Sequence, residues 1–204
     1  MPIIGSLAGA SSRGLGGLIT FGSVVSAIGD FEAIATVQGT NSSRELVFNS
    51  IPSTYKHLMI RGVGNQNHGG NDYGNFGIRL NGHSNATHTA HMQRSYWDGS
   101  TGNAQTVNLN SYDYAFCGIT RLATSNTEPG LGAAIFTILD YTTNKTKTVR
   151  CISGFGFPPS NRGILQHGVS TSTDFTSVVN SITVYSSNSN WTSKTKFSLY
   201  GIKG

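Results

Sequence analysis

The sequence has few charged residues and almost no cysteine. Charged side chains make up 11% of the 204 residues, and Lys and Arg outnumber Asp and Glu by 14 to 9. So little charge, with the remaining polarity supplied by Asn, Ser, Thr and Gly, is typical of turns and of exposed strand faces. The two cysteines, Cys117 and Cys151, are too few for a disulfide framework, so we expect buried free thiols.

The net charge of +5 is not concentrated in one basic stripe. The densest basic group consists of Lys145, Lys147 and Arg150. In a strand, Lys145 and Lys147 would share one face and Arg150 would lie on the other. We therefore expect solvated side chains here rather than a track for phosphates, and we expect no nucleic-acid partner.

The sequence also lacks recognisable catalytic and metal-binding signatures. Three of the six histidines lie between His83 and His91, but His88 and His91 would point to opposite faces of a strand, whereas zinc ligands must converge. We expect exposed loop histidines instead. No nucleophile elbow is present, the cysteines have no family signature around them, and residues 14–17 lack the ending of a phosphate loop. These observations predict a protein that is not an enzyme and that has no metal or cofactor.

A polysaccharide-degrading enzyme remains an alternative, because it needs only two carboxylates across one cleft. The available carboxylates are Asp72, Asp98, Asp113, Asp140 and Asp174.

Residues 1–29 form an apolar, glycine-rich segment with one charged side chain, Arg13. Its glycines argue against an autonomous helix, and a segment so apolar risks aggregation if it stays solvated. It lacks the charged start of a secretory signal, and polar residues break it too often for a membrane span. We expect an arm that docks on a partner, although Leu18, Thr20 and residues 24–27 could instead add a first strand to the domain. The expected docking residues are Ile3, Ile4, Leu7, Leu15, Leu18, Ile19 and Phe21.

From Phe31 onward, runs rich in Ile, Val, Thr, Phe and Tyr alternate with turn residues. This pattern predicts an all-β domain over residues 30–204, an antiparallel β-sandwich that is jelly-roll-like. Asn81-Gly82 predicts a hairpin turn, and residues 65–75 are expected to form an exposed loop. Strands are expected near residues 31–38, 44–50, 55–62, 75–80, 88–96, 113–120, 132–141, 146–154, 163–169, 178–185 and 195–202.

Several motifs within these strands are distinctive. They are Ile51–Arg61 (IPSTYKHLMIR), Ile78–Gly82 (IRLNG), Ile138–Tyr141 (ILDY) with Lys145–Thr148 (KTKT), and Lys196–Ile202 (KFSLYGI). Together they resemble a family of tailed-phage structural proteins, especially from phages of cyanobacteria and other aquatic bacteria. The resemblance covers most of residues 30–204.

The resemblance implies a small virion component of the tail, fibre or baseplate, assembled in the cytoplasm of the bacterial host. The opening Met-Pro-Ile-Ile-Gly-Ser is similar to the start of such proteins, where a glycine-rich arm would dock on other virion proteins. A homo-oligomer is expected, with a trimer favoured for a fibre component. None of the motifs is catalytic.

Aromatic residues near the predicted loops suggest a second function. Tyr73, Tyr96, Trp97 and Trp191 could stack on sugar rings, or they could cap the core or fill a seam between subunits. Tyr73 and Trp97, beside the loops at 65–75 and 98–103, are the candidate contacts to a receptor such as a host surface glycan. The sequence thus predicts a virion protein anchored by its arm, with a lectin-like receptor-binding module and a capsid decoration protein as alternatives.

Overall fold

The computed structural model describes residues 19–20, 23–24, 30–67, 73–85, 88–97, 101–123, 131–157, 162–172, 176–187 and 189–204. Contacts divide the chain into two compact units, residues 1–32 and 33–204. In the first unit, β1 (Ile19–Thr20) pairs antiparallel with β2 (Ser23–Val24) in a two-stranded sheet of their own. The expected docking residues lie outside the described residues, apart from the backbone of Ile19.

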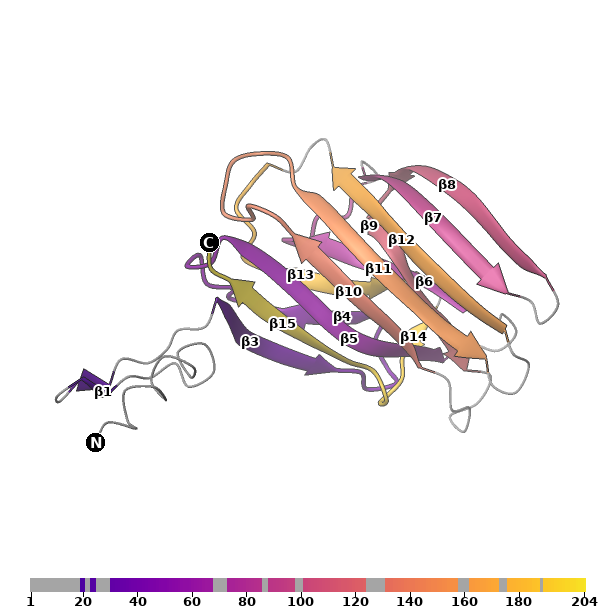
Figure 1. Cartoon of the computed structure of the whole chain (residues 1–204), viewed down its shortest axis with the longest axis horizontal. Coiled ribbons are helices and arrows are strands. Elements are labelled where there is room, and N and C mark those ends of the chain that lie inside the picture. Colours follow the sequence, from indigo (N-terminus) through magenta and orange to yellow (C-terminus); the bar gives the residue numbers. More distant parts are fainter. Residues whose placement is uncertain are drawn as a thin grey trace, which may run out of the picture. The chain divides into compact units, whose positions relative to one another are not determined.

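The sandwich unit consists of a large sheet and a small sheet, which lie one in front of the other in Figure 1. The order in the large sheet is β3 (Phe31–Gln38), β15 (Lys196–Ile202), β5 (His57–Asn67), β10 (Gly132–Ile138), β11 (Thr148–Phe157), β12 (Arg162–Ser172), β7 (His88–Trp97) and β8 (Gly102–Tyr112). The small sheet contains β4 (Glu45–Phe48), β13 (Ile182–Ser186), β6 (Tyr73–Leu80) and β9 (Ala115–Ala123).

The long strand β5 belongs to both sheets. Its first part pairs with β10 and β15 in the large sheet, and its last residues pair with β9 and with β14 (Asn190–Trp191). The pairing of β5 with β9 is parallel and covers three residues, whereas the other pairings with a described register are antiparallel. The predicted all-β, antiparallel sandwich is confirmed. The jelly-roll-like connectivity stays a prediction.

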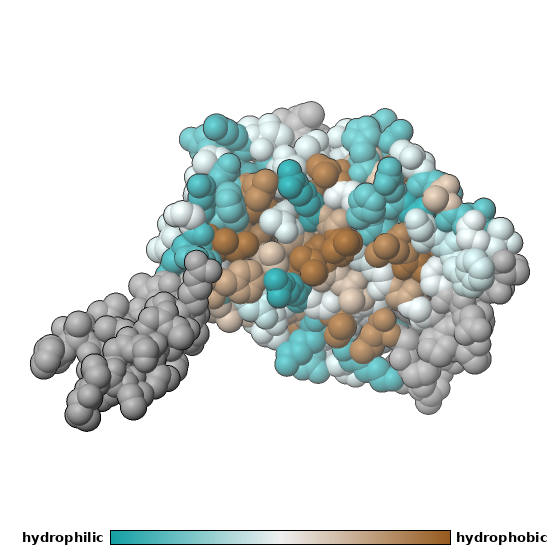
Figure 2. Space-filling view, viewed as in Figure 1, coloured by the Kyte–Doolittle hydropathy of each residue, from teal (hydrophilic) through white to brown (hydrophobic). Residues whose placement is uncertain are grey.

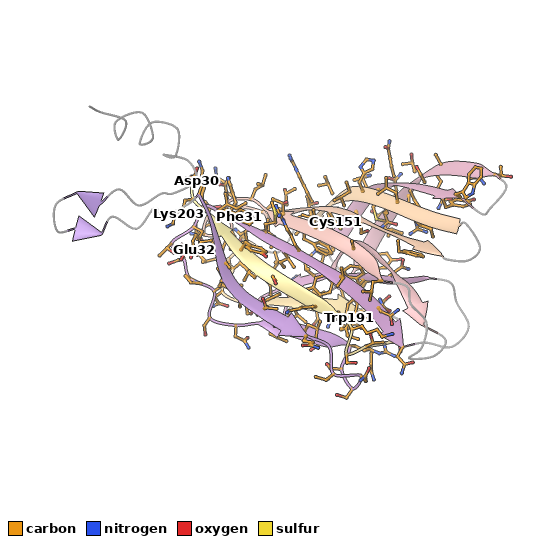
Figure 3. The ribbon with its side chains drawn as sticks, turned by 60° about the horizontal axis from the view of Figure 1, so that its bottom comes forward. Asp30, Phe31, Glu32, Cys151, Trp191 and Lys203 are labelled. Carbon is orange, nitrogen blue, oxygen red and sulfur yellow. The ribbon has the colours of Figure 1, made fainter. Side chains whose placement is uncertain are left out.

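The hydrophobic core lies between the two sheets, where alternate side chains of each strand meet. In β10, Ala134, Phe136 and Ile138 are buried while Ile135 on the other side is exposed. Phe76 of β6 and Phe136 of β10 join the sheets with ring centres 5.5 Å apart. Figure 3 shows the side chains that fill this layer.

Trp191 is part of this core rather than of a loop surface. It is fully buried, its ring lies edge-on to Phe76 and Phe197 at 5.2 and 5.7 Å, and its Nε1 donates a hydrogen bond to the Val184 carbonyl at 3.3 Å. Of the two interpretations of Trp191, the core role is confirmed and sugar stacking is excluded. A buried Trp whose N–H has a partner is a core residue.

Much of the expected 65–75 loop is strand. β5 continues to Asn67 and β6 already begins at Tyr73. Of the expected loop, residues 68–72 lie outside the described residues. Asn65 and Gln66 are buried, and the Asn65 carbonyl accepts hydrogen bonds from the Thr192 backbone and the Thr195 hydroxyl. The Asn65 backbone therefore pairs inside the sandwich, and both residues are buried instead of facing water.

The Asn81-Gly82 turn forms, but it does not make a hairpin. Both residues have positive φ (51° and 69°), and the His83 amide donates to the Leu80 carbonyl at 2.9 Å, as in the expected tight turn. The strands on either side do not pair, since β6 lies in the small sheet and β7 in the large one. Asn81 Oδ1 instead accepts from the Asn180 and Ser181 amides of the segment before β13.

Lys147 is buried rather than solvated, which contradicts the expectation for the basic cluster. It is 2% exposed, and its Nζ donates to the backbone carbonyls of Thr143, Lys145 at 2.7 Å and Thr176 at 3.4 Å. Burial lowers the pKa of this ammonium, and Asp140 opposes the shift. Lys147 thus connects the loop before β11 to the segment before β13.

Candidate functional site: the outer face of the large sheet

One side of the large sheet faces away from the core. Side chains alternate along each strand, so every second residue of β15, β5, β10, β11, β12, β7 and β8 points away from the small sheet, and we call this surface the outer face. Cross-strand pairing arranges these residues in rows. One row consists of Ser198, Arg61, Ile135, Ile152, His167 and Gln93, and the next of Lys196, Val63, Ala133, Gly154, Leu165 and Ser95.

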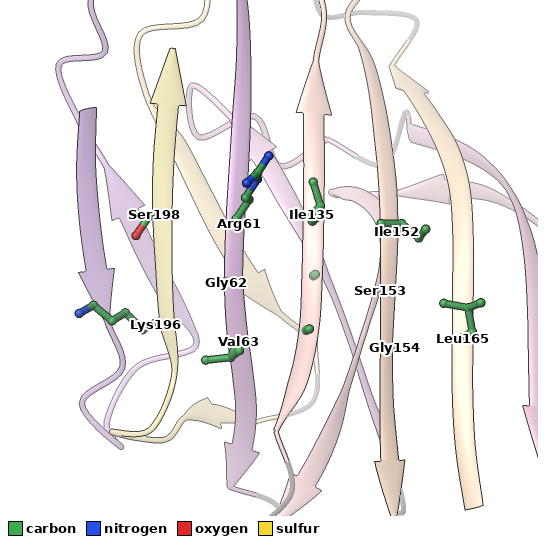
Figure 4. A pocket seen from close by; sticks show the side chains of 12 residues that line it. Arg61, Gly62, Val63, Ile135, Ile152, Ser153, Gly154, Leu165, Lys196 and Ser198 are labelled. Carbon is green, nitrogen blue, oxygen red and sulfur yellow. The ribbon is translucent and has the colours of Figure 1, made fainter. Parts of the chain in front are cut away.

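Apolar side chains occupy the middle of the outer face. Ile152 and Leu165 are 48% and 52% exposed, and Ile135 is also exposed. Next to them, Ala133 and Gly154 have little or no side chain, so a hollow of about 660 Å³ forms there. Figure 4 shows the lining residues, and Figure 2 shows hydrophobic side chains gathered across this face. A contiguous exposed apolar patch marks an interaction surface in many soluble proteins.

The charged residues within the seven strands that form the outer face have one sign. None of the nine acidic residues of the chain lies in the seven strands that form it. Arg61, Arg150 and Lys196 are exposed there. Arg61 Nε donates to Met59 Sδ at 3.0 Å, and its guanidinium lies 5.9 Å from the centre of the Tyr200 ring, so β5 and β15 side chains orient the cation at the edge of the apolar hollow. The charge carried by these seven strands is therefore positive, which favours an anionic partner.

A second hollow, of about 470 Å³, lies further along the same face. His91, Asn108, Arg150, His167 and Gln93 line it. His91 Nδ1 and Asn108 Oδ1 are 2.8 Å apart and share a hydrogen bond between β7 and β8. The outer face thus combines an apolar region over β10 and β11 with hydrogen-bonding groups over β7, β8 and β12.

Trp97 ends β7 on the outer face and is 47% exposed. Its cross-strand neighbours are Gly163 and Gly102, so no neighbouring side chain covers the ring from these positions. With Leu165, Trp97 lines a hollow of about 600 Å³. The expectation that Trp97 is accessible is consistent with this geometry, although its role in receptor contact stays a prediction.

Tyr73 lies in the other sheet. It starts β6 and pairs with Arg121 of β9, while its side chain is outside the described part of the chain. Tyr96 is partly buried, and as the neighbour of Trp97 on β7 it alternates away from the outer face. The structure therefore does not bring Tyr73 and Trp97 together through any described strand pairing.

The histidines of β7 lie on opposite faces, as the spacing predicts. His91 is exposed on the outer face, whereas His88 is 2% exposed on the core side, so the expectation of an exposed loop residue is wrong for His88. Burial, together with the nearby His83 and Arg79, lowers the pKa of His88 to about 4, although Asp113 acts in the opposite direction. A neutral, structural imidazole is the result at physiological pH.

The candidate catalytic carboxylates are placed as follows. Asp113 accepts hydrogen bonds from Arg79, whose guanidinium also binds Glu45 at 2.9 Å. Asp140 lies two residues after β10, and its Oδ1 is 3.6 Å from His57 Nδ1. The other three, Asp72, Asp98 and Asp174, lie outside the described residues. In the described ranges, no group of three His, Cys, Asp or Glu side chains could hold a metal ion.

Cys151 is a buried free thiol, as predicted, whereas the Cys117 side chain is outside the described residues. No helix in the described part of the chain is both long enough and apolar enough to cross a membrane.

Comparisons with protein-family models, with curated proteins and with solved structures found no match to this chain. Any functional proposal therefore rests on the residues of the chain itself.

Proposed function

We propose that this protein is a structural component of a tailed-phage particle, located in the tail, fibre or baseplate. In this role residues 1–29 anchor it to another virion protein, and the sandwich supplies a rigid domain whose outer face contacts further partners. The observation that carries the proposal is the outer face. Ile135, Ile152 and Leu165 expose adjoining aliphatic side chains on a fixed sheet, which is the kind of surface that assembly proteins bury.

Two features of the sequence support the same role. The first 29 residues hold many apolar side chains and a single charge, which suits a segment that becomes buried on a partner. The motifs that resemble tailed-phage proteins supply much of the sandwich core: Leu58, Ile60, Ile138 and Leu199 are all fully buried. The motifs thus specify a folded domain that can be built into a larger particle.

Deletion of residues 1–29 tests the anchoring role. The truncated protein should keep its β-sheet circular dichroism, because the sandwich has its own core, but it should be lost from particles purified from infected or complemented cells. The full-length Arg13→Ser variant is the matched control and should be incorporated normally, since apolar residues are expected to make the contact. Normal incorporation of the truncated protein would refute anchoring by this segment.

A second candidate function is binding of a host surface glycan, and the exposure of Trp97 favours it. The ring projects between two glycines on the outer face, and a flat aromatic face can stack on a sugar ring. Replacement of Tyr73 and Trp97 by Ala should then slow adsorption of particles to the host, by a free-energy loss of about 1 to 3 kcal/mol at a true contact. Unchanged adsorption with a folded double variant would rule out these two residues as glycan contacts, and the structural role would be the only one still proposed.

A further inference from the structure

We propose that the apolar hollow beside Arg61 binds a short segment of another protein in which carboxylate side chains lie next to aliphatic ones. The inference deepens the proposed function, and rests on it, because it names the partner chemistry of the outer face. It does not depend on where in a particle the protein sits.

The apolar part of the site sets the kind of ligand. Ile135, Ile152 and Leu165 stand around a floor of Ala133 and Gly154, as Figure 4 shows for the labelled side chains. These residues lie on neighbouring strands, which are about 4.8 Å apart. The hollow from β5 to β12 therefore spans about 14 Å, which an extended segment of roughly four or five residues covers at about 3.3 Å each. Aliphatic side chains of such a segment would bury the exposed isoleucines.

The charged part of the site determines the sign of the charge that the bound segment carries. Arg61 and Lys196 line the hollow from β5 and β15, on the side opposite Leu165. Arg61 is oriented by Met59 and Tyr200, and a guanidinium fixed in this way can receive a carboxylate with two parallel hydrogen bonds. Because the seven strands contain no Asp or Glu, an incoming carboxylate meets no acidic group on these strands.

The same charges argue against the protein's own N-terminal segment as the occupant. Residues 1–29 contain no Asp or Glu, and their single charge is Arg13. This segment would bury the isoleucines but would leave Arg61 without a carboxylate and would bring a further cation to the face. A second outer face has the same defect, since it also has only positive charge to offer.

A simple polyanion is disfavoured for a different reason. A nucleic acid or an acidic polysaccharide would pair its negative charges with Arg61 and Lys196. It would, however, cover Ile135 and Ile152 with phosphates, hydroxyls or other polar groups. Three cations distributed over several strands also do not form the continuous basic track that such chains require.

Three labelled hexapeptides of defined sequence test the inference against the full-length protein by fluorescence anisotropy. The first alternates Glu and Leu, the second alternates Lys and Leu, and the third alternates Glu and Ser. The Glu-Leu peptide should bind at least about tenfold more tightly than either of the others, because only it offers both carboxylates and aliphatic groups. A labelled peptide of residues 1–29 and polygalacturonate serve as probes of the competing occupants.

Two variants locate the binding in the hollow. Arg61→Glu should weaken binding of the Glu-Leu peptide about tenfold and should strengthen binding of the Lys-Leu peptide, while Ile152→Ser should weaken both Leu-containing peptides. Arg44→Glu is the matched control: it makes the same charge change at an exposed residue just before β4, in the small sheet, and should leave binding unchanged. β-Sheet circular dichroism reports whether each variant is folded.

Several results would overturn the inference. Equal binding of the Glu-Leu and Glu-Ser peptides, or competition by polygalacturonate, would indicate a polyanion site. Tighter binding of the residue 1–29 peptide would indicate the protein's own segment, and no binding of any peptide would remove the hollow as a protein site. Each of these results could occur with normal incorporation into particles, so failure of this inference is separable from failure of the proposed function.

Discussion

Acidification should destabilise the sandwich through His88, and the effect can be worked out from the structure. The imidazole is buried with a pKa of about 4, against about 6.5 in the unfolded chain. Below pH 6.5 the unfolded state therefore binds a proton that the folded state refuses, so the free energy of unfolding falls as the pH falls. The linkage relation gives a loss of about 2 kcal/mol at pH 5 and about 3 kcal/mol at pH 4, with no loss above pH 7.

The comparison with His88→Leu isolates this contribution from that of the carboxylates around Arg79. Both ring nitrogens of His88 lack a hydrogen-bond partner among the described residues, so leucine should be tolerated at pH 7. Urea unfolding followed by tryptophan fluorescence at pH 7, 5 and 4 gives the free energy of unfolding of each protein. The wild-type protein should lose about 3 kcal/mol more than His88→Leu between pH 7 and pH 4.

Equal losses in the two proteins would refute the reasoning. They would mean that His88 is protonated as easily in the folded chain as in the unfolded one, and that the acid sensitivity comes from other groups. A large loss of stability in His88→Leu already at pH 7 would show instead that the imidazole makes a necessary polar contact.

Two further predictions concern stability. Trp191→Ala should cost about 3 to 5 kcal/mol in the free energy of unfolding, because it leaves a cavity next to Phe76 and Phe197, and thermal unfolding followed by circular dichroism measures it; a loss under 1 kcal/mol would contradict the core role. Arg79→Ala should cost about 2 kcal/mol, since the guanidinium binds Glu45 and Asp113 and stacks at 3.5 Å on Tyr185, whereas Arg44→Ala should have little effect in the same assay.

The sequence predicts the strands whose side chains alternate clearly and misses those that do not. β3 is found at its observed bounds, and the face of β5 with Leu58 and Ile60 is buried as expected. β8 was not predicted because Gly102–Tyr112 is dominated by Asn, Gln, Thr and Gly, with Val107 and Leu109 as its only large aliphatic residues. β8 is the edge strand of the large sheet and pairs with β7 along its length. This pairing holds β8 in the sheet although its own residues alternate only weakly.

Polar residues were the hardest to place. Nothing in the local pattern distinguishes Lys147 from the exposed Lys145 two residues earlier. The Lys147 ammonium donates to carbonyl groups of its own loop and of the segment before β13, which the sequence does not show to be close. His88 is buried by packing between sheets, which a period-2 pattern cannot reveal. The Asn81-Gly82 turn has the predicted conformation, but its role in crossing between sheets depends on which strands pair later in the chain.

Part of the outer face could be predicted and part could not. The run around Ile135 is apolar on both faces, which indicates a central strand. That its second face stays exposed, next to Ile152 and Leu165, follows only from the order of the strands. The absence of acidic residues from seven adjoining strands likewise becomes visible only when the strand order is known.

Electron cryomicroscopy of intact particles is the most direct test of the central proposal. The structural role predicts density for the sandwich at a fixed site in the tail, fibre or baseplate, with residues 1–29 buried against a different virion protein. Absence of the protein from purified particles, or density in which residues 1–29 contact no other protein, would contradict it.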